Sequence, residues 1–154
     1  MVARDTRLLI LGSLPGERSL AQQRYYAHPQ NLFWHLIGTV IGRELQPLSY
    51  DDRLAALLRA GVGLWDVVAS ATRSGSLDRA IRGAAHNPLN HLAATLPQLR
   101  AVGFNGGTAT RIGNSQLAGT GLALVPLPSS SPAYASMSRM EKERRWAALR
   151  DFLE

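Results

Sequence analysis

Apolar residues along the chain form short runs that alternate with segments of helical periodicity. Short apolar runs bounded by glycine, proline or polar residues predict buried strands over residues 8–11, 62–68, 100–104 and 122–127. Apolar residues at helical spacing predict helices over residues 32–41, 53–60, 88–96, 108–117 and 140–153, and a short helix is expected over 76–81. Strands that alternate with helices indicate an α/β fold: a three-layer α/β/α sandwich around a central, mostly parallel four-stranded sheet.

Length and composition fit one ordinary globular domain. The chain has 154 residues, of which 45% are hydrophobic and 18% charged, so we expect a single domain over 1–154. No apolar stretch approaches the ~20 residues that a membrane span needs, and the first residues lead straight into a strand. We therefore expect a cytoplasmic protein, a monomer, without a signal peptide or a membrane partner.

Cysteine content and charge narrow the possible chemistry. The chain has no cysteine, which excludes disulfides, thiolate zinc sites and cysteine-held iron–sulfur clusters. No metal or cofactor is expected. The net charge of +6 favours a polyanionic partner such as nucleic acid. Many small proteins are basic, however, so charge alone leaves that partner open.

Two glycine-, proline- and serine-rich loops follow the first and the last predicted strands. The first loop is Gly12-Ser13-Leu14-Pro15-Gly16, and the last is Leu127-Pro128-Ser129-Ser130-Ser131-Pro132-Ala133. The carboxyl ends of parallel strands meet at one edge of a sheet, where ligands bind. The sequence therefore predicts that both loops border one binding site.

Further motifs lie between these loops. The segment YYAHPQNLFW, residues 25–34, combines aromatic rings with a histidine and a carboxamide, and GLWDVV, residues 63–68, is followed by RSGSLD. Together with GSLPG and LPSSSPA, these motifs make the chain similar to the uracil-DNA glycosylase superfamily, and most of all to its hypoxanthine-DNA (deoxyinosine) glycosylase branch. The resemblance covers nearly the whole chain and implies the same three-layer sandwich.

The resemblance implies a monofunctional glycosylase of base excision repair, which flips a deaminated base out of DNA and hydrolyses its N-glycosidic bond. Hypoxanthine is the first expected substrate, with uracil or xanthine as further possibilities. The expected partner is DNA that contains such a base. The only lysine, Lys142, is expected on the last helix, away from the site, so no lysine nucleophile is implied.

Two positions depart from the family pattern. The superfamily places a water-activating Asp or Asn just before the proline of the first loop, and this chain has Leu14 there. It also often places a histidine before the proline of the last loop, and this chain has Leu127. Both departures argue against strong action on uracil. Hypoxanthine is a better leaving base because a purine can be protonated at N7.

The aromatic segment supplies a stacking ring and a candidate catalytic group. By the resemblance, Tyr26 stacks on the flipped base, and such stacking contributes roughly 1–3 kcal/mol. Asn31 is the candidate to replace the group missing at Leu14, because its carboxamide can both accept from water and donate to a developing anion. The alternative is that Asn31 caps the helix that follows, and the two roles are compatible.

The base edge would be recognised at the end of the second strand. The resemblance places Asp66 at the position that recognises the Watson–Crick edge, where a carboxylate could accept from N1–H of hypoxanthine. Backbone N–H groups of Gly12 and Ser13 would serve O6, with Leu14 beside them. The alternative is a buried aspartate that pairs with an arginine such as Arg73 or caps a following turn.

The remaining candidates are expected to contact the DNA backbone. They are small, polar or turn-forming residues of three loops: Pro15 and Gly16, Asn105 and Gly106, and Ser129, Ser130, Ser131 and Pro132. By the resemblance, residues 131–133 occupy the place of the wedge that fills the vacated stack. The alternatives are a simple turn after the third strand and a serine-rich surface turn after the fourth.

Three other functions remain open from the residues. One is a mismatch-type uracil or thymine glycosylase, against which Leu14 and Leu127 argue. Another is a non-catalytic DNA-binding or nucleotide-sensing domain of the same fold, which the same two leucines favour. A serine hydrolase built on Ser129–Ser131 is the weakest, because the chain lacks a G-x-S-x-G elbow.

Overall fold

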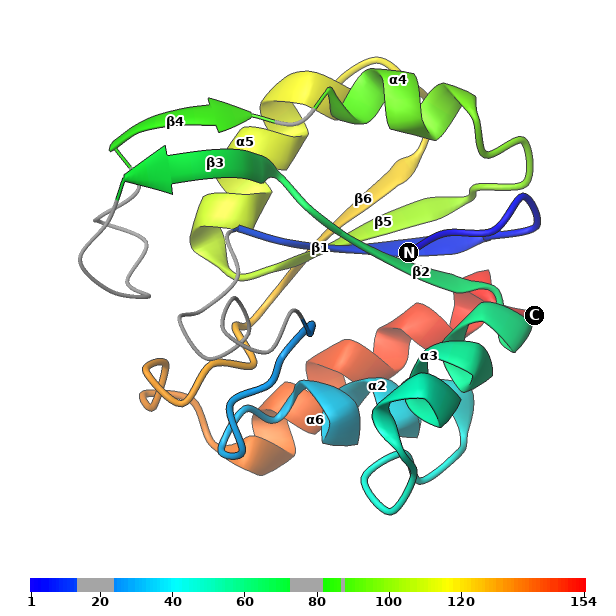
Figure 1. Ribbon diagram of the computed structural model, residues 1–154, viewed down its shortest axis with the longest axis vertical. Coiled ribbons are helices and arrows are strands. Elements are labelled where there is room, and N and C mark those ends of the chain that lie inside the picture. The colour runs from blue at the N-terminus through cyan, green and yellow to red at the C-terminus, as the bar shows by residue number, and fades with distance from the viewer. Residues whose placement is uncertain (14–23, 73–81, 87) are drawn as a thin grey trace.

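A computed structural model describes residues 1–13, 24–72, 82–86 and 88–154 of the chain. Its centre is a four-stranded sheet in the order β2-β1-β5-β6, in which every neighbouring pair is parallel (Figure 1). The strands are β1 (Leu8–Gly12), β2 (Val62–Asp66), β5 (Ala101–Asn105) and β6 (Ala123–Leu127). All four predicted strands are therefore present.

Helices cover both faces of this sheet, as the sandwich prediction requires. On one face lie α2 (Phe33–Ile41), α3 (Tyr50–Arg59) and α6 (Arg139–Ala147), and on the other lie α4 (Leu89–Ala94) and α5 (Gly107–Leu117) (Figure 1). The chain ends in a short 3₁₀ helix, η2 (Ala148–Phe152). The predicted helix over 76–81 lies outside the described residues.

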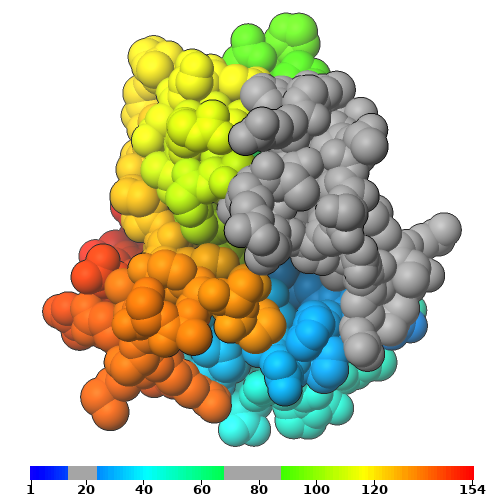
Figure 2. All heavy atoms as spheres, turned by 90° about the vertical axis from the view of Figure 1, so that its left-hand side faces the viewer, coloured from blue at the N-terminus to red at the C-terminus, as the bar shows by residue number. Residues whose placement is uncertain are grey.

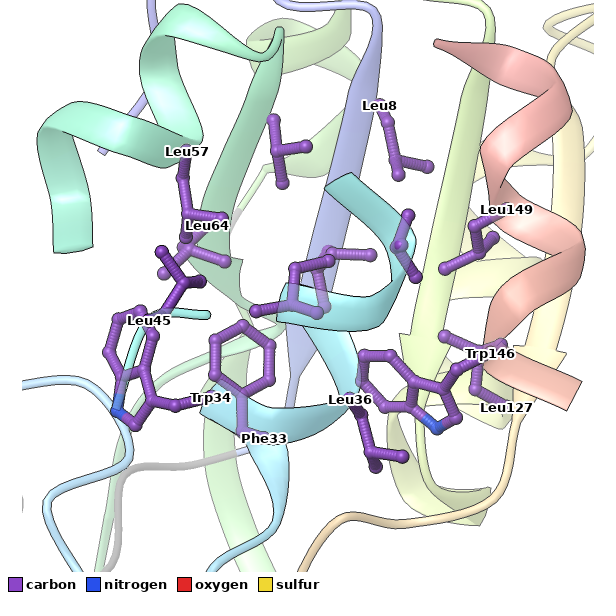
Figure 3. Close-up of a cluster of buried hydrophobic side chains, with 14 of the residues drawn as sticks. Leu8, Phe33, Trp34, Leu36, Leu45, Leu57, Leu64, Leu127, Trp146 and Leu149 are labelled. Carbon is purple, nitrogen blue, oxygen red and sulfur yellow. The ribbon is translucent and has the colours of Figure 1, made fainter. Parts of the chain in front are cut away.

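Alternate residues of the central strand β1 face the two helical layers. Leu8 and Ile10 pack with α2, α3 and α6, whereas Leu9 and Leu11 pack with α4 and α5. All four are buried, as expected for a strand covered on both sides. Figure 3 shows the first of these cores, in which Phe33 of α2 lies between Trp34 and Trp146. Phe33 and Trp34 are therefore core residues.

Local sequence explains where the helices begin and end. The Ser49 and Ser138 hydroxyls accept hydrogen bonds from the backbone N–H groups of Asp52 and Glu141, and so cap α3 and α6. The helix α2 ends at Gly42. This residue has a φ of 74°, a left-handed conformation that glycine adopts without a steric penalty.

Two predicted boundaries were wrong. The strand predicted over 62–68 ends at Asp66, because the chain then bends and enters the antiparallel hairpin of β3 (Val68–Thr72) and β4 (Arg82–His86). The terminal helix tightens into η2 from Ala148 instead of continuing as one α-helix to 153. A short apolar run shows no boundary of its own where both of its halves are extended, so the pattern merged β2 with β3.

Candidate active site

The carboxyl ends of the four parallel strands bring the predicted site residues to one edge of the sheet. Gly12 ends β1 in register with Asp66, which ends β2, and Asn105 ends β5 in register with Leu127, which ends β6. Figure 2 shows the face at this edge: the loop after β6 (orange) lies beside the segment that leads into α2 (blue), below α5 (yellow-green). The structure thus gathers segments that lie far apart in the sequence.

Gly12 stands where two polar side chains converge. A β-carbon at Gly12 would lie 3.0 Å from Oδ1 of Asp66 and 3.1 Å from the hydroxyl oxygen of Tyr26. Only a residue without a side chain leaves both groups this close to the strand. The sequence prediction that Gly12, Tyr26 and Asp66 lie together is therefore met in their geometry, and Ser13 follows directly after β1, half-buried.

Burial raises the pKa of both polar groups at Gly12. Burial raises the pKa of Asp66 to about 6, although the positive charge of the amino terminus at Met1 opposes this rise. Burial and, to a lesser degree, the negative charge of Asp66 hold the pKa of the Tyr26 hydroxyl far above its usual value. At neutral pH the site therefore presents an ionised carboxylate that can accept a hydrogen bond and a phenol that keeps its proton.

Tyr26 is fixed by its backbone and by its ring. Its φ of 51° is the only positive value among the described non-glycine residues. The ring stacks on Phe33, with 3.8 Å between ring centroids and 15° between planes. One face of the Tyr26 ring is therefore covered by the core, and a base can stack only on the other face.

Asn31 precedes Leu32, the N-cap residue of α2, and its side-chain oxygen bonds to the first residue of this helix. Oδ1 accepts a hydrogen bond of 2.9 Å from the backbone N–H of Phe33. Among the described residues, the amide nitrogen Nδ2 donates to no partner. The oxygen thus satisfies the first N–H of α2, as a cap would, although the N-cap position itself is held by Leu32. The nitrogen is left to act as a donor. His28 is exposed and accepts from the N–H of Gln30, which makes it part of the preceding turn.

Asn105 holds Ser130 through two hydrogen bonds. Its Oδ1 accepts from the backbone N–H of Ser130, and its Nδ2 donates to the Ser130 hydroxyl, each at 2.9 Å. Next to it, Gly106 has a φ of 99°, and a β-carbon there would lie 3.3 Å from that of Ser129. The loops after β5 and β6 are therefore in close contact.

The terminal helix holds the rest of the loop after β6. Trp146 donates from Nε1 to the carbonyl of Pro128 at 3.0 Å, and the buried Lys142 donates from Nζ to the carbonyl of Tyr134 at 2.7 Å. Between these two anchors, Ser129 and Ser131 are half-buried and Pro132 is exposed. Pro132 and its neighbours therefore face solvent from a loop that is held at both ends.

Two positions of the site loops cannot supply a polar side chain or are not described by the structure. Leu127, where the family often has a histidine, is buried in the core next to Trp146 (Figure 3). Its side chain serves packing, and no ionisable group takes its place at the end of β6. Leu14, Pro15 and Gly16 lie outside the described residues.

The part of the chain that the structure describes contains no cluster of three or more His, Cys, Asp or Glu side chains that could bind a metal ion. None of its helices is both long and apolar enough to cross a membrane. Among the described residues, the polar groups predicted for the site are Asp66, Tyr26 and Asn31, with the backbone amides around them.

Comparisons with known proteins agree with this architecture. The family model described as the uracil DNA glycosylase superfamily matches residues 1–153. A hypoxanthine DNA glycosylase of Methanosarcina acetivorans is 39% identical over 145 residues, which cover 94% of this chain and 90% of the relative. A second relative with the same name, from Methanosarcina barkeri, is 43% identical over 106 residues, or 69% of this chain and 67% of the relative.

A solved structure shows the same fold. It is a solution NMR structure described as a candidate uracil DNA glycosylase from Methanosarcina acetivorans, with a TM-score of 0.89 and 38% identity over 99% of this chain and 94% of that one. The chain belongs to the uracil DNA glycosylase superfamily.

The sequence pattern missed the contacts that hold the site together. Serine in a loop is usually solvated, yet Ser130 is only 1% exposed and is bonded to Asn105. The pattern also gave no sign that Phe33 stacks on Tyr26, because a residue pair seven apart across a loop has no fixed spacing. The one available signal was the carboxamide of Asn105 at a strand end, which was interpreted as a DNA contact.

Proposed function

We propose that this chain is a monofunctional DNA glycosylase of base excision repair that removes deaminated bases, with hypoxanthine first and uracil or xanthine as further substrates. The observation that carries the proposal is the meeting of Asp66 and Tyr26 at Gly12, with Asn31 bonded to Phe33, the residue whose ring Tyr26 stacks on. Support also comes from two relatives that are named hypoxanthine DNA glycosylase.

The flipped base is held by an aromatic face and a carboxylate. It stacks on the face of Tyr26 that Phe33 leaves open. Asp66, ionised above pH 6, accepts a hydrogen bond from N1–H of hypoxanthine. Backbone N–H groups of Gly12 and Ser13 donate to O6, with Leu14 beside them. This donor and acceptor pattern fits a base that has lost its amino group, because deamination replaces the amino donor with a carbonyl and puts a proton on N1.

Asn31 is the catalytic residue of the proposal. A water molecule attacks the sugar C1′, the bond from C1′ to the base nitrogen breaks, and the electron pair leaves with the base. The Nδ2 group of Asn31 donates to the negative charge that develops, while its Oδ1 stays fixed by Phe33. The water loses a proton and the base gains one, so the products are free hypoxanthine and an abasic site.

The loops around the base contact the DNA backbone. The proposed contacts are small or polar residues of three loops: Pro15 and Gly16, Asn105 and Gly106, and Ser129, Ser130, Ser131 and Pro132. The net charge of +6 supports attraction to the duplex. We further propose that a single domain acts as a monomer in the cytoplasm, where its DNA substrate lies, without a metal or a cofactor.

Release of base from labelled duplexes that carry one deoxyinosine, deoxyxanthosine or deoxyuridine tests the proposal. Abasic sites are counted by strand cleavage in alkali, and the released base is identified by mass. Hypoxanthine release by the wild type that is lost in Asn31→Ala supports the proposal. Binding to every duplex without release of any base would leave a DNA-binding domain of the same fold instead.

A further inference from the structure

We propose that Asn105 is a positioning residue for base excision: it fixes the loop after β6, and through Ser130 the start of α2, against the end of β5 before DNA binds. This inference rests on the proposed function and replaces the direct DNA contact proposed there for Asn105 by an indirect role, because both polar atoms of its side chain already bind Ser130. Asn105 and Ser130 together join three segments of the chain: the end of β5, the loop after β6 and the start of α2.

The orientation of the Asn105 carboxamide is determined by its partners. The backbone N–H of Ser130 can only donate, so the atom that faces it at 2.9 Å must be the oxygen of the carboxamide. The nitrogen then faces the Ser130 hydroxyl, also at 2.9 Å. Because both ends of the side chain are engaged with one residue, Asn105 cannot rotate without breaking two hydrogen bonds at once.

The Asn105 carboxamide also acts on Tyr26. It lowers the pKa of the Tyr26 hydroxyl, against the larger opposite effect of burial. Because an Nδ2 group has two hydrogens, its bond to Ser130 leaves one hydrogen for this side of the site.

Ser130 carries this connection on to the catalytic segment. Its side chain is 1% exposed, and its carbonyl accepts a hydrogen bond of 3.0 Å from the backbone N–H of Leu32, the residue after Asn31. A displacement of Ser130 would therefore shift the start of α2. Asn105, Ser130 and Leu32 form a continuous set of hydrogen bonds from β5 to the residue next to the proposed catalytic amide.

The backbone at Gly106 lets the loops after β5 and β6 approach each other closely. Gly106 donates its N–H to the carbonyl of Leu127 at 3.1 Å and has a φ of 99°. A β-carbon there would lie 3.3 Å from that of Ser129, so a larger residue would separate the two loops. Asn105 is therefore placed to act on DNA through Ser130, since both polar atoms of its side chain are already engaged.

Removal of this side chain should separate positioning from DNA affinity. In Asn105→Ala we expect the single-turnover rate constant for hypoxanthine release to fall by about tenfold to a hundredfold, the range expected when catalytic groups are misplaced by about 1 Å. The affinity for an undamaged duplex should not change, because the charges that attract DNA remain. In the same variant, amide hydrogen exchange at Ser130 and Leu32 should become faster.

Three further variants complete the experiment. Ser130→Ala keeps the backbone N–H that donates to Asn105 and loses only the hydroxyl. We therefore expect smaller changes in the rate and in hydrogen exchange. This variant also tests the proposal if Asn105→Ala does not fold. Asn114→Ala makes the same replacement at an exposed position of α5 and should behave as wild type. Ser49→Ala removes the α3 cap and shows what a loss of stability alone does.

The outcomes are distinct. A lower rate together with faster exchange at Ser130 and Leu32 supports the proposal, and unchanged exchange or an unchanged rate overturns it. A fall in affinity for undamaged DNA with an unchanged single-turnover rate would make Asn105 a phosphate contact instead. If the wild type releases no base, the proposed function fails, and the exchange measurement alone then decides whether Asn105 holds the two loops together.

Discussion

The side-chain oxygen of Asn31 accepts a hydrogen bond of 2.9 Å from the backbone N–H of Phe33. This contact fixes the carboxamide at the start of α2. It engages only the oxygen, so the acceptor and the donor of the side chain can have separate roles. The oxygen stabilises the helix, and the nitrogen keeps its hydrogens for another partner. Capping and catalysis therefore belong to the same residue, and substitutions can separate them.

Asn31→Asp should keep the fold and lose the activity. Aspartate retains the oxygen that accepts from Phe33 and places a negative charge at a helix N-terminus, so the melting temperature should not fall. It has no N–H to donate, so base release should fall by about 10²–10³-fold, as when one donor to a developing anion is removed. Single-turnover release and thermal unfolding measure the two effects.

Asn31→Ala is the matched control for the cap. It removes the acceptor as well as the donor, so it should lose about 1 kcal/mol of stability in addition to the activity. Full activity in Asn31→Asp would contradict the role of the amide nitrogen and would favour water activation by the oxygen.

Gly12→Ala should damage the site by steric contact. The added methyl group would lie 3.0 Å from Asp66 Oδ1 and 3.1 Å from the Tyr26 hydroxyl, so both groups must move. We expect release to fall by about tenfold to a hundredfold for such a displacement. Steady-state kcat and KM for a deoxyinosine duplex measure the loss.

Gly42→Ala provides the control for this change. It is the same substitution at the far end of α2, where a β-carbon meets nothing within 4 Å but the φ of 74° is strained. It should lower stability by about 1 kcal/mol and leave release unchanged at a temperature below unfolding. Equal activity losses in both variants would mean that stability, and not the site, is responsible.

The pH dependence of release should report Asp66. Its pKa is raised by burial to about 6, and only the ionised carboxylate can accept from N1–H. The activity of the wild type relative to Asp66→Asn should therefore fall as pH drops through about 6, since the asparagine oxygen accepts at every pH. The ratio of the two rates removes any effect of protonating the base itself. A flat ratio from pH 5 to 8 would contradict base recognition by Asp66.

The stability of the folded chain should fall as pH rises, whereas the activity rises with pH. The pKa of Asp66 is higher in the folded chain than the ordinary value of about 3.9, so the folded state binds the proton more tightly and loses stability as pH rises from about 4 through 6. Asp66→Asn does not titrate, so its stability relative to wild type should rise by about 1–3 kcal/mol over that range. Thermal unfolding at pH 4 and pH 8 measures this difference.

Tyr26 offers a test of stacking that allows for its backbone. Tyr26→Phe keeps the ring on Phe33 and loses only the hydroxyl, so its loss of activity should be the smaller one. Tyr26→Asn suits the φ of 51° but has no ring, and it should weaken productive base binding by about 1–3 kcal/mol. Competition by a duplex with a non-cleavable deoxyinosine analogue gives the affinities. Equal affinities in both variants would exclude a stacking role.

The fold was largely predictable, since buried parallel strands and amphipathic helices leave strong patterns. Leu8–Leu11 shows one continuous apolar run because both faces of β1 are covered. The hairpin that begins at Val68 was missed because it continues the apolar run of β2, and only the bend at Val67 separates them.

The site was predictable in its residues and less so in its contacts. Gly12, Tyr26 and Asp66 were expected together, since the ends of parallel strands converge and the aromatic segment matched the family pattern. The two hydrogen bonds between Asn105 and Ser130 were not predicted, and the expected DNA contacts of both residues stay a prediction. A periodicity of apolar residues carries no information on such polar pairs, because they lie in loops whose course depends on the complete fold.

The most direct test of the account is single-turnover release of hypoxanthine from a duplex with one deoxyinosine, by the wild type and by Asn31→Asp. The account predicts that the wild type releases hypoxanthine and leaves an abasic site, and that Asn31→Asp, folded as stably as the wild type, is slower by about 10²–10³-fold. Equal rates in the two proteins, or binding of the duplex by the wild type with no release of base, would contradict it.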